Sequence, residues 1–282
     1  MRISAYAVGI AALFTTAMAS TIPHRLRDGL TAYDVNTNSS TTCVTPKEIP
    51  DLEGSEIRNI GMVLFRAFDM IDVFGTLEPF QLLSLTTQQL KLHLIAASLD
   101  PVTTQPLTMN PYNSSFFPVI QPTNTFDDDL DLDLLIVPGG PGARSPSLDK
   151  EIAYIKKMFP KVKILMTVCT GAGVAAQSGV MDGYMATTNK KAWAVMTAKG
   201  PNVNWVSPAR FVIDGKVWSS SGVTSALDLV FNFIETYWGS EKSETIANTI
   251  EHVPLAVDDD PFAAISGVEP TVAKPCEESS CQ

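Results

Sequence analysis

The chain has 282 residues, of which 45% are hydrophobic, and its formal net charge at pH 7 is −10. This length is sufficient for one sizeable α/β domain. The acidity argues against nucleic acids and anionic membrane surfaces as partners, because both are themselves negatively charged.

The N-terminus has the pattern of a secretory signal peptide. Arg2 supplies a short basic region, residues 5–14 are apolar, and residues 17–19 (Ala-Met-Ala) form a small-x-small cleavage site. The apolar run is well short of the roughly 20 residues that a transmembrane helix needs, and no later run approaches that length. We therefore expect residues 1–19 to be removed and the mature chain to be secreted.

Residues 20–56 form a polar N-terminal arm without periodicity, which we expect either to wrap on the domain or to be disordered. Residues 100–129 are rich in Pro, Asn, Thr and Asp and predict a short hairpin and loops. Each of these polar segments contains an Asn-x-Ser sequon, at Asn38 and at Asn113, which predicts a surface glycosylation site.

A domain is expected over residues 57–254, in which strands alternate with helices. Expected strands cover 57–65, 90–98, 132–137 and 162–168, with a hairpin over 210–220; expected helices cover 72–83, 148–159, the segment after 169, 190–198, 223–238 and 241–250. The apolar strands lack polar alternation, so we predict a mostly parallel sheet covered on both faces. Residues 255–282 are an acidic tail that we expect outside the core.

An apolar run over residues 164–168 stops at Cys169, and small residues then open a helix. A thiol at a helix N-terminus is expected to have a lowered pKa and to act as a nucleophile. The alternative is an inert, buried strand cysteine. Gly139 and Gly140 also follow a buried strand, and ligands of parallel sheets bind beyond the carboxyl ends of the strands. This convergence favours a functional Cys169.

The remaining cysteines are Cys43 in the arm and Cys276 and Cys281 in the tail. An exported protein permits a disulfide between the two tail cysteines, or between one of them and Cys43. The sequence does not choose between these pairings.

Several motifs resemble the PfpI/ThiJ superfamily, which has the class I glutamine amidotransferase-like fold. They are Asp72-Val73-Phe74-Gly75 with Glu78, Leu135-Ile136-Val137-Pro138-Gly139-Gly140, and Thr167-Val168-Cys169-Thr170-Gly171. The runs Ala186-Thr187-Thr188 and Ser221-Gly222-Val223-Thr224-Ser225-Ala226-Leu227-Asp228, with Glu251 and Pro254, resemble its isonitrile hydratase branch. The resemblance implies a three-layer α/β sandwich with a flavodoxin-like sheet, and a homodimer.

The resemblance also implies roles for single residues. Cys169 would be the nucleophile on a sharp elbow, and Asp72 would hydrogen-bond the sulfur or act as general acid and base. Thr170 and the glycines Gly139, Gly140 and Gly222 would bind substrate or a developing negative charge. The alternatives are structural: Asp72 or Thr170 as a helix cap, and the glycines as tight turns.

One departure from the family pattern is important. Many members carry a histidine after the Thr-Thr pair, where this chain has Asn189, and its histidines are His24, His93 and His252. A Cys–His pair for amide hydrolysis is therefore poorly supported. We also find no metal-ligand spacing and no cofactor-binding fingerprint.

The leading functional hypothesis is a cysteine-dependent hydratase that adds water to small isonitriles and yields N-substituted formamides. A glyoxalase- or deglycase-like enzyme acting on small reactive carbonyls is the alternative within enzymes. A third hypothesis is a non-enzymatic redox-sensing or binding protein, since an activated cysteine beside a carboxyl oxidises readily.

Overall fold

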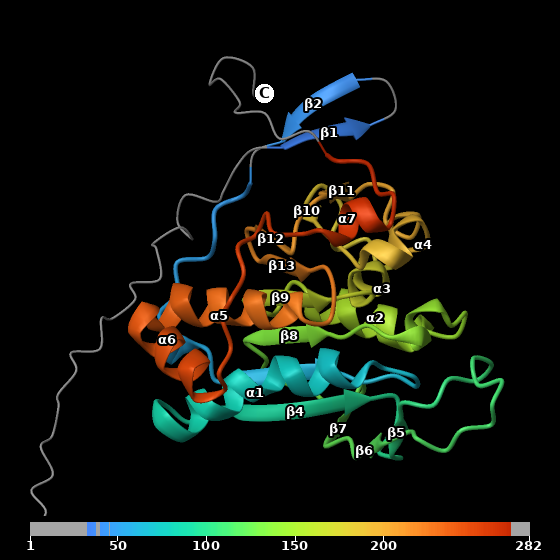
Figure 1. The fold of residues 1–282 in the computed structure, drawn as a ribbon. Coiled ribbons are helices and arrows are strands. Elements are labelled where there is room, and N and C mark those ends of the chain that lie inside the picture. Colours follow the sequence, from blue (N-terminus) through green and yellow to red (C-terminus); the bar gives the residue numbers. More distant parts are fainter. Residues whose placement is uncertain (1–32, 38–39, 45, 272–282) are drawn as a thin grey trace, which may run out of the picture.

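The computed structural model describes residues 33–37, 40–44 and 46–271 (Figure 1). The strands are β1 Tyr33–Thr37, β2 Ser40–Val44, β3 Asn59–Val63, β4 Lys91–Ala96, β5 Val102–Thr103, β6 Val119–Ile120, β7 Asn124–Thr125, β8 Leu134–Val137, β9 Ile164–Val168, β10 Met185–Ala186, β11 Asn204–Trp205, β12 Phe211–Asp214 and β13 Val217–Ser220. The α-helices are α1 Met70–Thr86, α2 Asp149–Met158, α3 Gly171–Gln177, α4 Trp193–Thr197, α5 Ser225–Trp238, α6 Ser240–Thr249 and α7 Phe262–Ile265. Short 3₁₀ turns cover Gly54–Glu56, Pro141–Arg144 and Lys190–Ala192.

A seven-stranded sheet in the order β12-β13-β9-β8-β3-β4-β7 forms the centre of the molecule. All neighbours in it are parallel except β12 and β13, which form an antiparallel hairpin. The strands from β4 to β13 therefore follow the flavodoxin-like order, in which the chain reverses direction across the sheet between β3 and β8. Figure 1 shows the strands descending from β12 to β7.

Helices cover both faces of this sheet, so the predicted three-layer sandwich is confirmed. Ile60 and Leu134 pack on one face with residues of α1, α5 and α6, whereas Val63 and Leu135 pack on the other with residues of α2 and α3. Because successive strand residues point to opposite faces, both registers of each central strand must be apolar. This arrangement explains the absence of polar alternation in the sequence.

The structure extends several predicted elements and adds others. The first helix begins at Met70 rather than at 72, because Asp69 accepts a hydrogen bond from the Ile71 N–H and caps it. The stretch 100–129 contains the expected hairpin, β5 with β6, and also the edge strand β7, which is too short to leave a hydropathy pattern. The arm forms a further hairpin, β1 with β2, that no sequence pattern predicted.

The chain after residue 254 was expected outside the core, and for its described part this expectation is wrong. Asp260 is buried, and its Oδ2 lies 3.1 Å from Nζ of the equally buried Lys190. The Arg210 N–H donates to the Val257 carbonyl (2.8 Å), and the Ser207 N–H donates to the Thr271 hydroxyl (3.0 Å). Acidic composition suggested a solvated tail, but one of its carboxylates neutralises a buried ammonium.

Some expectations fall on residues outside the described part of the chain. They are the signal peptide, Asn38, and the tail cysteines Cys276 and Cys281. Asn113 is exposed in the loop between β5 and β6, where its glycosylation stays a prediction. In the described part, no helix is both long and apolar enough to cross a membrane.

A group of aromatic rings holds α5 on the sheet and provides a test of the core. The ring of Phe233 is fully buried and lies 5.0 Å from Trp218, 4.9 Å from Tyr237 and 5.8 Å from Phe80. Phe233→Ala should lower the free energy of unfolding by about 3–5 kcal/mol in urea denaturation. Phe116→Ala removes a ring that is 85% exposed and should change it by less than about 0.5 kcal/mol.

The buried ion pair provides a second test. Asp260→Ala leaves the Lys190 ammonium buried without its carboxylate and should destabilise the protein by about 3–5 kcal/mol. The matched variant is Asp258→Ala, since Asp258 is an exposed carboxylate two residues away. Equal unfolding midpoints for the two variants would contradict a structural role for the C-terminal segment.

Candidate active site

The candidate residues meet where the sheet reverses its strand order. Asp72 lies in the first turn of α1 after β3, Gly139 and Gly140 follow β8, and Cys169 follows β9. These parallel strands end at the same edge of the sheet, as the sequence indicated. Their catalytic roles stay predictions, but the structure does place these residues together.

Cys169 occupies a strained turn between β9 and α3. Its φ is +56°, a left-handed conformation that is uncommon for residues other than glycine and costs of order 1–3 kcal/mol. The Cys169 N–H donates to the Ser220 carbonyl (3.1 Å), and the Thr188 hydroxyl donates to the Cys169 carbonyl (2.9 Å). Hydrogen bonds therefore hold the backbone of the elbow on both sides of Cys169, and this residue is only 6% exposed.

Asp72 is fully buried and points its carboxyl group into the site. Oδ2 accepts a hydrogen bond from the Gly139 N–H (2.8 Å), whereas Oδ1 forms no hydrogen bond of standard geometry with the described residues. Burial raises the pKa of Asp72 from 3.8 to about 7, and the Asp69 carboxylate adds to the rise. The Gly139 N–H and the nearby Cys169 thiol partly oppose it. Because Asp69 caps α1, the alternative that Asp72 is the N-cap is wrong.

The expected lowering of the thiol pKa is also wrong. Burial raises the pKa of Cys169 well above its usual range, and the negative charge of Asp72 raises it further. Hydrogen bonds from the Thr170 N–H and the Asn189 side chain lower it, but less. The sequence showed the helix after Cys169 but not the degree of burial. Desolvation at this buried position outweighs the interactions that favour the thiolate.

Thr170 packs closely against Gly139 and Gly140, which lie in the loop between β8 and α2. The Gly140 N–H donates to the Thr170 hydroxyl (2.9 Å), which donates back to the Gly140 carbonyl (3.2 Å). Thr170 therefore does not cap α3 with its side chain. Gly140 has φ +133°, and a Cβ on Gly139 would lie 2.6 Å from Thr170 N and 2.8 Å from Asp72 Oδ2. Both glycines are thus required by the close approach of these segments.

These contacts change what the expected oxyanion donors can do. The N–H groups of Gly139 and Gly140 are already engaged, by Asp72 and Thr170 respectively, so neither is free for a substrate in this conformation. The Thr170 N–H instead acts on the thiol, whose pKa it lowers. Gly222 follows β13 beyond the same edge of the sheet, two residues after Ser220, and its binding role stays a prediction.

The described histidines lie in other environments. His93 is buried in β4, where its Nδ1 lies 2.9 Å from Asn124 Oδ1. His252 stacks on Phe231, and its Nε2 lies 3.1 Å from Asp228 Oδ1. The position after the Thr-Thr pair is held by Asn189, which follows the Thr188 side chain that bonds the Cys169 carbonyl. Sequence reasoning noted Asn189 only as a missing histidine and did not single out Lys190, whose buried amine supports the same segment.

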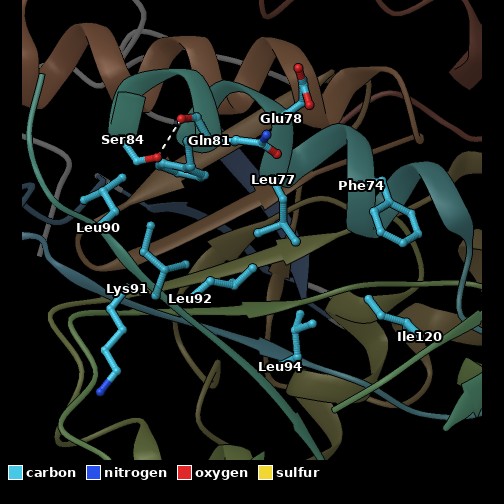
Figure 2. Close-up of a pocket in the computed structure, with 12 residues that line it drawn as sticks. Phe74, Leu77, Glu78, Gln81, Ser84, Leu90, Lys91, Leu92, Leu94 and Ile120 are labelled. Carbon is cyan, nitrogen blue, oxygen red and sulfur yellow. Dashed lines mark hydrogen bonds between the residues drawn. The ribbon is translucent and has the colours of Figure 1, made fainter. Parts of the chain in front are cut away.

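A separate hollow of about 300 Å³ lies between α1 and β4 (Figure 2). Its walls are mostly apolar, with Phe74, Leu77, Leu92 and Ile120 among them, and neither Asp72 nor Cys169 lines it. Glu78, the last residue of the first-helix motif, is exposed beside this hollow. The residues of this motif therefore serve two separate regions: Asp72 is buried in the thiol site, and Glu78 lies at the exposed hollow.

Comparison with known proteins agrees with this architecture. The DJ-1/PfpI family matches residues 59–236. The chain belongs to the DJ-1/PfpI family. A solved member, a ThiJ/PfpI family protein from Pseudomonas syringae, superposes with a TM-score of 0.59 at 24% identity and covers 75% of this chain and 84% of that one.

Two curated relatives of this DJ-1/PfpI protein differ in function. An isonitrile hydratase from Pseudomonas putida is 27% identical over 198 residues, which are 69% of this chain and 78% of that protein. The HTH-type transcriptional regulator GbdR from Pseudomonas aeruginosa is 25% identical over 190 residues, which are 67% of this chain and 49% of the regulator. The chain thus spans about half of the regulator's length, and the expectation of no nucleic-acid partner stays a prediction.

Because the Asp72 carboxyl is buried, we expect the folded protein to be less stable when this group is ionised. A folded-state pKa above the unfolded one stabilises the protein below about pH 4, and this contribution is lost as the pH rises through about 7. At about 1.4 kcal/mol per pH unit, the penalty for the ionised carboxyl is on the order of 4 kcal/mol. Asp72→Asn keeps an acceptor for the Gly139 N–H and should be more stable than wild type at pH 8, by about 2–4 kcal/mol.

This difference should vanish near pH 4, where the wild-type carboxyl is protonated. Urea denaturation of both proteins at pH 4, 6 and 8 measures it. A wild-type protein as stable as Asp72→Asn at pH 8 would show that Asp72 is not destabilised by its burial.

Proposed function

We propose that this DJ-1/PfpI protein is a cysteine-dependent hydratase that adds water to small isonitriles and releases N-substituted formamides. The observation that carries the proposal is a nearly buried thiol, Cys169, beside a buried carboxyl, Asp72, whose pKa is about 7, with no imidazole at the site among the described residues. The isonitrile hydratase relative, although only 27% identical, supports the same chemistry.

Asp72 supplies the proton transfer that the raised thiol pKa requires. A general base works best when its pKa lies near the operating pH, and the Asp72 carboxyl meets this condition at neutral pH. When the sulfur attacks, the thiol proton moves to Asp72, so no free thiolate has to persist in the buried site. The strained elbow at Cys169 holds the sulfur in place for this attack.

The reaction balances with these two groups and one water. The Cys169 sulfur forms a bond to the terminal carbon of R–N≡C, and Asp72 returns the proton to that carbon, which gives the thioimidate R–N=CH–S–Cys. Water then adds to the same carbon, and the C–S bond breaks. The water oxygen becomes the formyl oxygen, one of its protons goes to nitrogen and the other restores the thiol.

The two alternative functions have less support from the site. A sensor that depends on a standing thiolate is disfavoured, because burial raises the pKa of Cys169 and oxidation follows thiolate character. Glyoxalase-like chemistry would also begin at the thiol, but its proton shuttle usually recruits a histidine, and Asn189 occupies that position.

The direct test is incubation of the purified protein with cyclohexyl isonitrile and chromatographic detection of N-cyclohexylformamide. Cys169→Ala should lower kcat by about 10³-fold or more, because it removes the nucleophile. Asp72→Asn should lower kcat by about 10²–10⁴-fold, the usual contribution of a general acid–base. Glu78→Gln makes the same carboxyl-to-amide change at an exposed site on the same helix and should retain wild-type kcat.

An unchanged rate in Cys169→Ala would rule out the mechanism. Methylglyoxal is assayed in parallel with lactate as the product. Turnover of methylglyoxal without turnover of the isonitrile would favour the glyoxalase-like alternative.

A further inference from the structure

The Lys190 side chain ends in a buried ammonium group whose partners come from separate segments of the chain. Its Nζ donates to the hydroxyls of Thr187 (2.8 Å) and Ser221 (3.0 Å). It also donates to the Ala209 carbonyl (2.9 Å) and lies 3.1 Å from Asp260 Oδ2. An ammonium has three N–H donors, so each of them has an acceptor here. Because the side chain is only 1% exposed, Lys190 acts on the rest of the protein through these partners.

Two of these partners adjoin the residues that hold the elbow at Cys169. Thr187 precedes Thr188, whose hydroxyl donates to the Cys169 carbonyl (2.9 Å). Ser221 follows Ser220, whose carbonyl accepts the Cys169 N–H (3.1 Å). One ammonium therefore joins the segment that binds the carbonyl side of the nucleophile to the segment that binds its N–H side.

The fold around these segments has other supports, so the contribution of Lys190 is local. The Thr187 N–H donates to the Ser219 hydroxyl (2.9 Å), which keeps this part of the chain on β13 without the amine. The left-handed conformation of Cys169 is costly and persists only where its surroundings impose it. Without the ammonium, the two segments are held less firmly, and the elbow is free to relax and to move the sulfur.

We propose that Lys190 is a positioning residue for the nucleophile: its ammonium links the segments on either side of Cys169 and so fixes the sulfur where it attacks. Lys190 acts through Thr188 and Ser220 and does not touch the substrate. A displacement of about 1 Å at a reacting atom costs up to about 10²-fold in rate, so a remote link of this kind affects catalysis. The inference rests on the proposed function in taking Cys169 as the attacking group, but not in the identity of the substrate.

Lys190 also neutralises Asp260, so the variants have to separate positioning from stability. The double variant Lys190→Met/Asp260→Asn removes the amine and both charges, and losing both members of a buried ion pair costs much less stability than losing one. Asp260→Asn alone leaves the amine without its counterion, which destabilises the protein. Even if the amine then loses a proton, it keeps two N–H donors for Thr187 and Ser221.

Positioning and stability therefore rank the two variants in opposite orders. The assays are run at pH 7, because burial lowers the pKa of Lys190 to about 8 and the wild-type amine is still mostly charged there. The kcat for cyclohexyl isonitrile should fall about tenfold or more in the double variant, with a smaller change in KM, and stay within about twofold of wild type in Asp260→Asn. The urea unfolding midpoint should instead be lower in Asp260→Asn than in the double variant.

A second readout does not depend on the substrate. Cys169 is only 6% exposed, and a relaxed elbow exposes its sulfur more often. Iodoacetamide should therefore alkylate Cys169 about tenfold faster in the double variant than in wild type or in Asp260→Asn. Mass spectrometry of the peptide that contains Cys169 distinguishes this residue from the other cysteines of the chain.

Alkylation of the double variant at the wild-type rate would overturn the role of Lys190, and so would an unchanged kcat where the isonitrile is turned over. Readouts that follow the unfolding midpoints, with Asp260→Asn the more impaired, would overturn it as well. Faster alkylation of the double variant without isonitrile turnover in any sample, wild type included, would support the positioning role and reject only the proposed substrate.

Discussion

The burial of the Asp72 carboxyl group is the constraint on which the site depends. Desolvation raises its pKa to about 7, and its single strong hydrogen bond comes from the Gly139 N–H. A side chain at residue 139 would collide with this carboxyl group and with Thr170, so the glycine is a consequence of the same packing. Burial raises the pKa of the adjacent thiol and the negative charge of Asp72 raises it further, so the site holds a protonated thiol rather than a preformed thiolate.

The elbow at Cys169 shows how the fold maintains this arrangement. Its positive φ is unfavourable for cysteine and is sustained by hydrogen bonds from two different segments, at Ser220 and at Thr188. Natural proteins retain such strain where the surrounding structure over-determines it, often at functional sites. Here the parallel strands β9 and β13 hold one side of the elbow, and the segment after β10, which carries Thr188, holds the other.

Sequence patterns predicted the strands and helices well, because each of these elements depends mainly on residues that are close together in the chain. Strands such as Leu134–Val137 are apolar at every position since both faces are covered, and the order of strands and helices then implies a parallel sheet. The pairing of Asp72 with Cys169 came from a family resemblance, because the two residues are far apart in the chain. The thiol pKa and the burial of Asp260 were mispredicted, since each depends on which residues meet in three dimensions.

The ion pair between Lys190 and Asp260 joins two segments of the chain that are synthesised at different times. Lys190 emerges from the ribosome well before Asp260, so its ammonium lacks its carboxylate partner until the chain beyond α6 has been made. The same ammonium donates to the hydroxyl of Thr187, which precedes the Thr188 side chain that bonds the Cys169 carbonyl. The surroundings of Cys169 thus include an ion pair that only the C-terminal segment can complete.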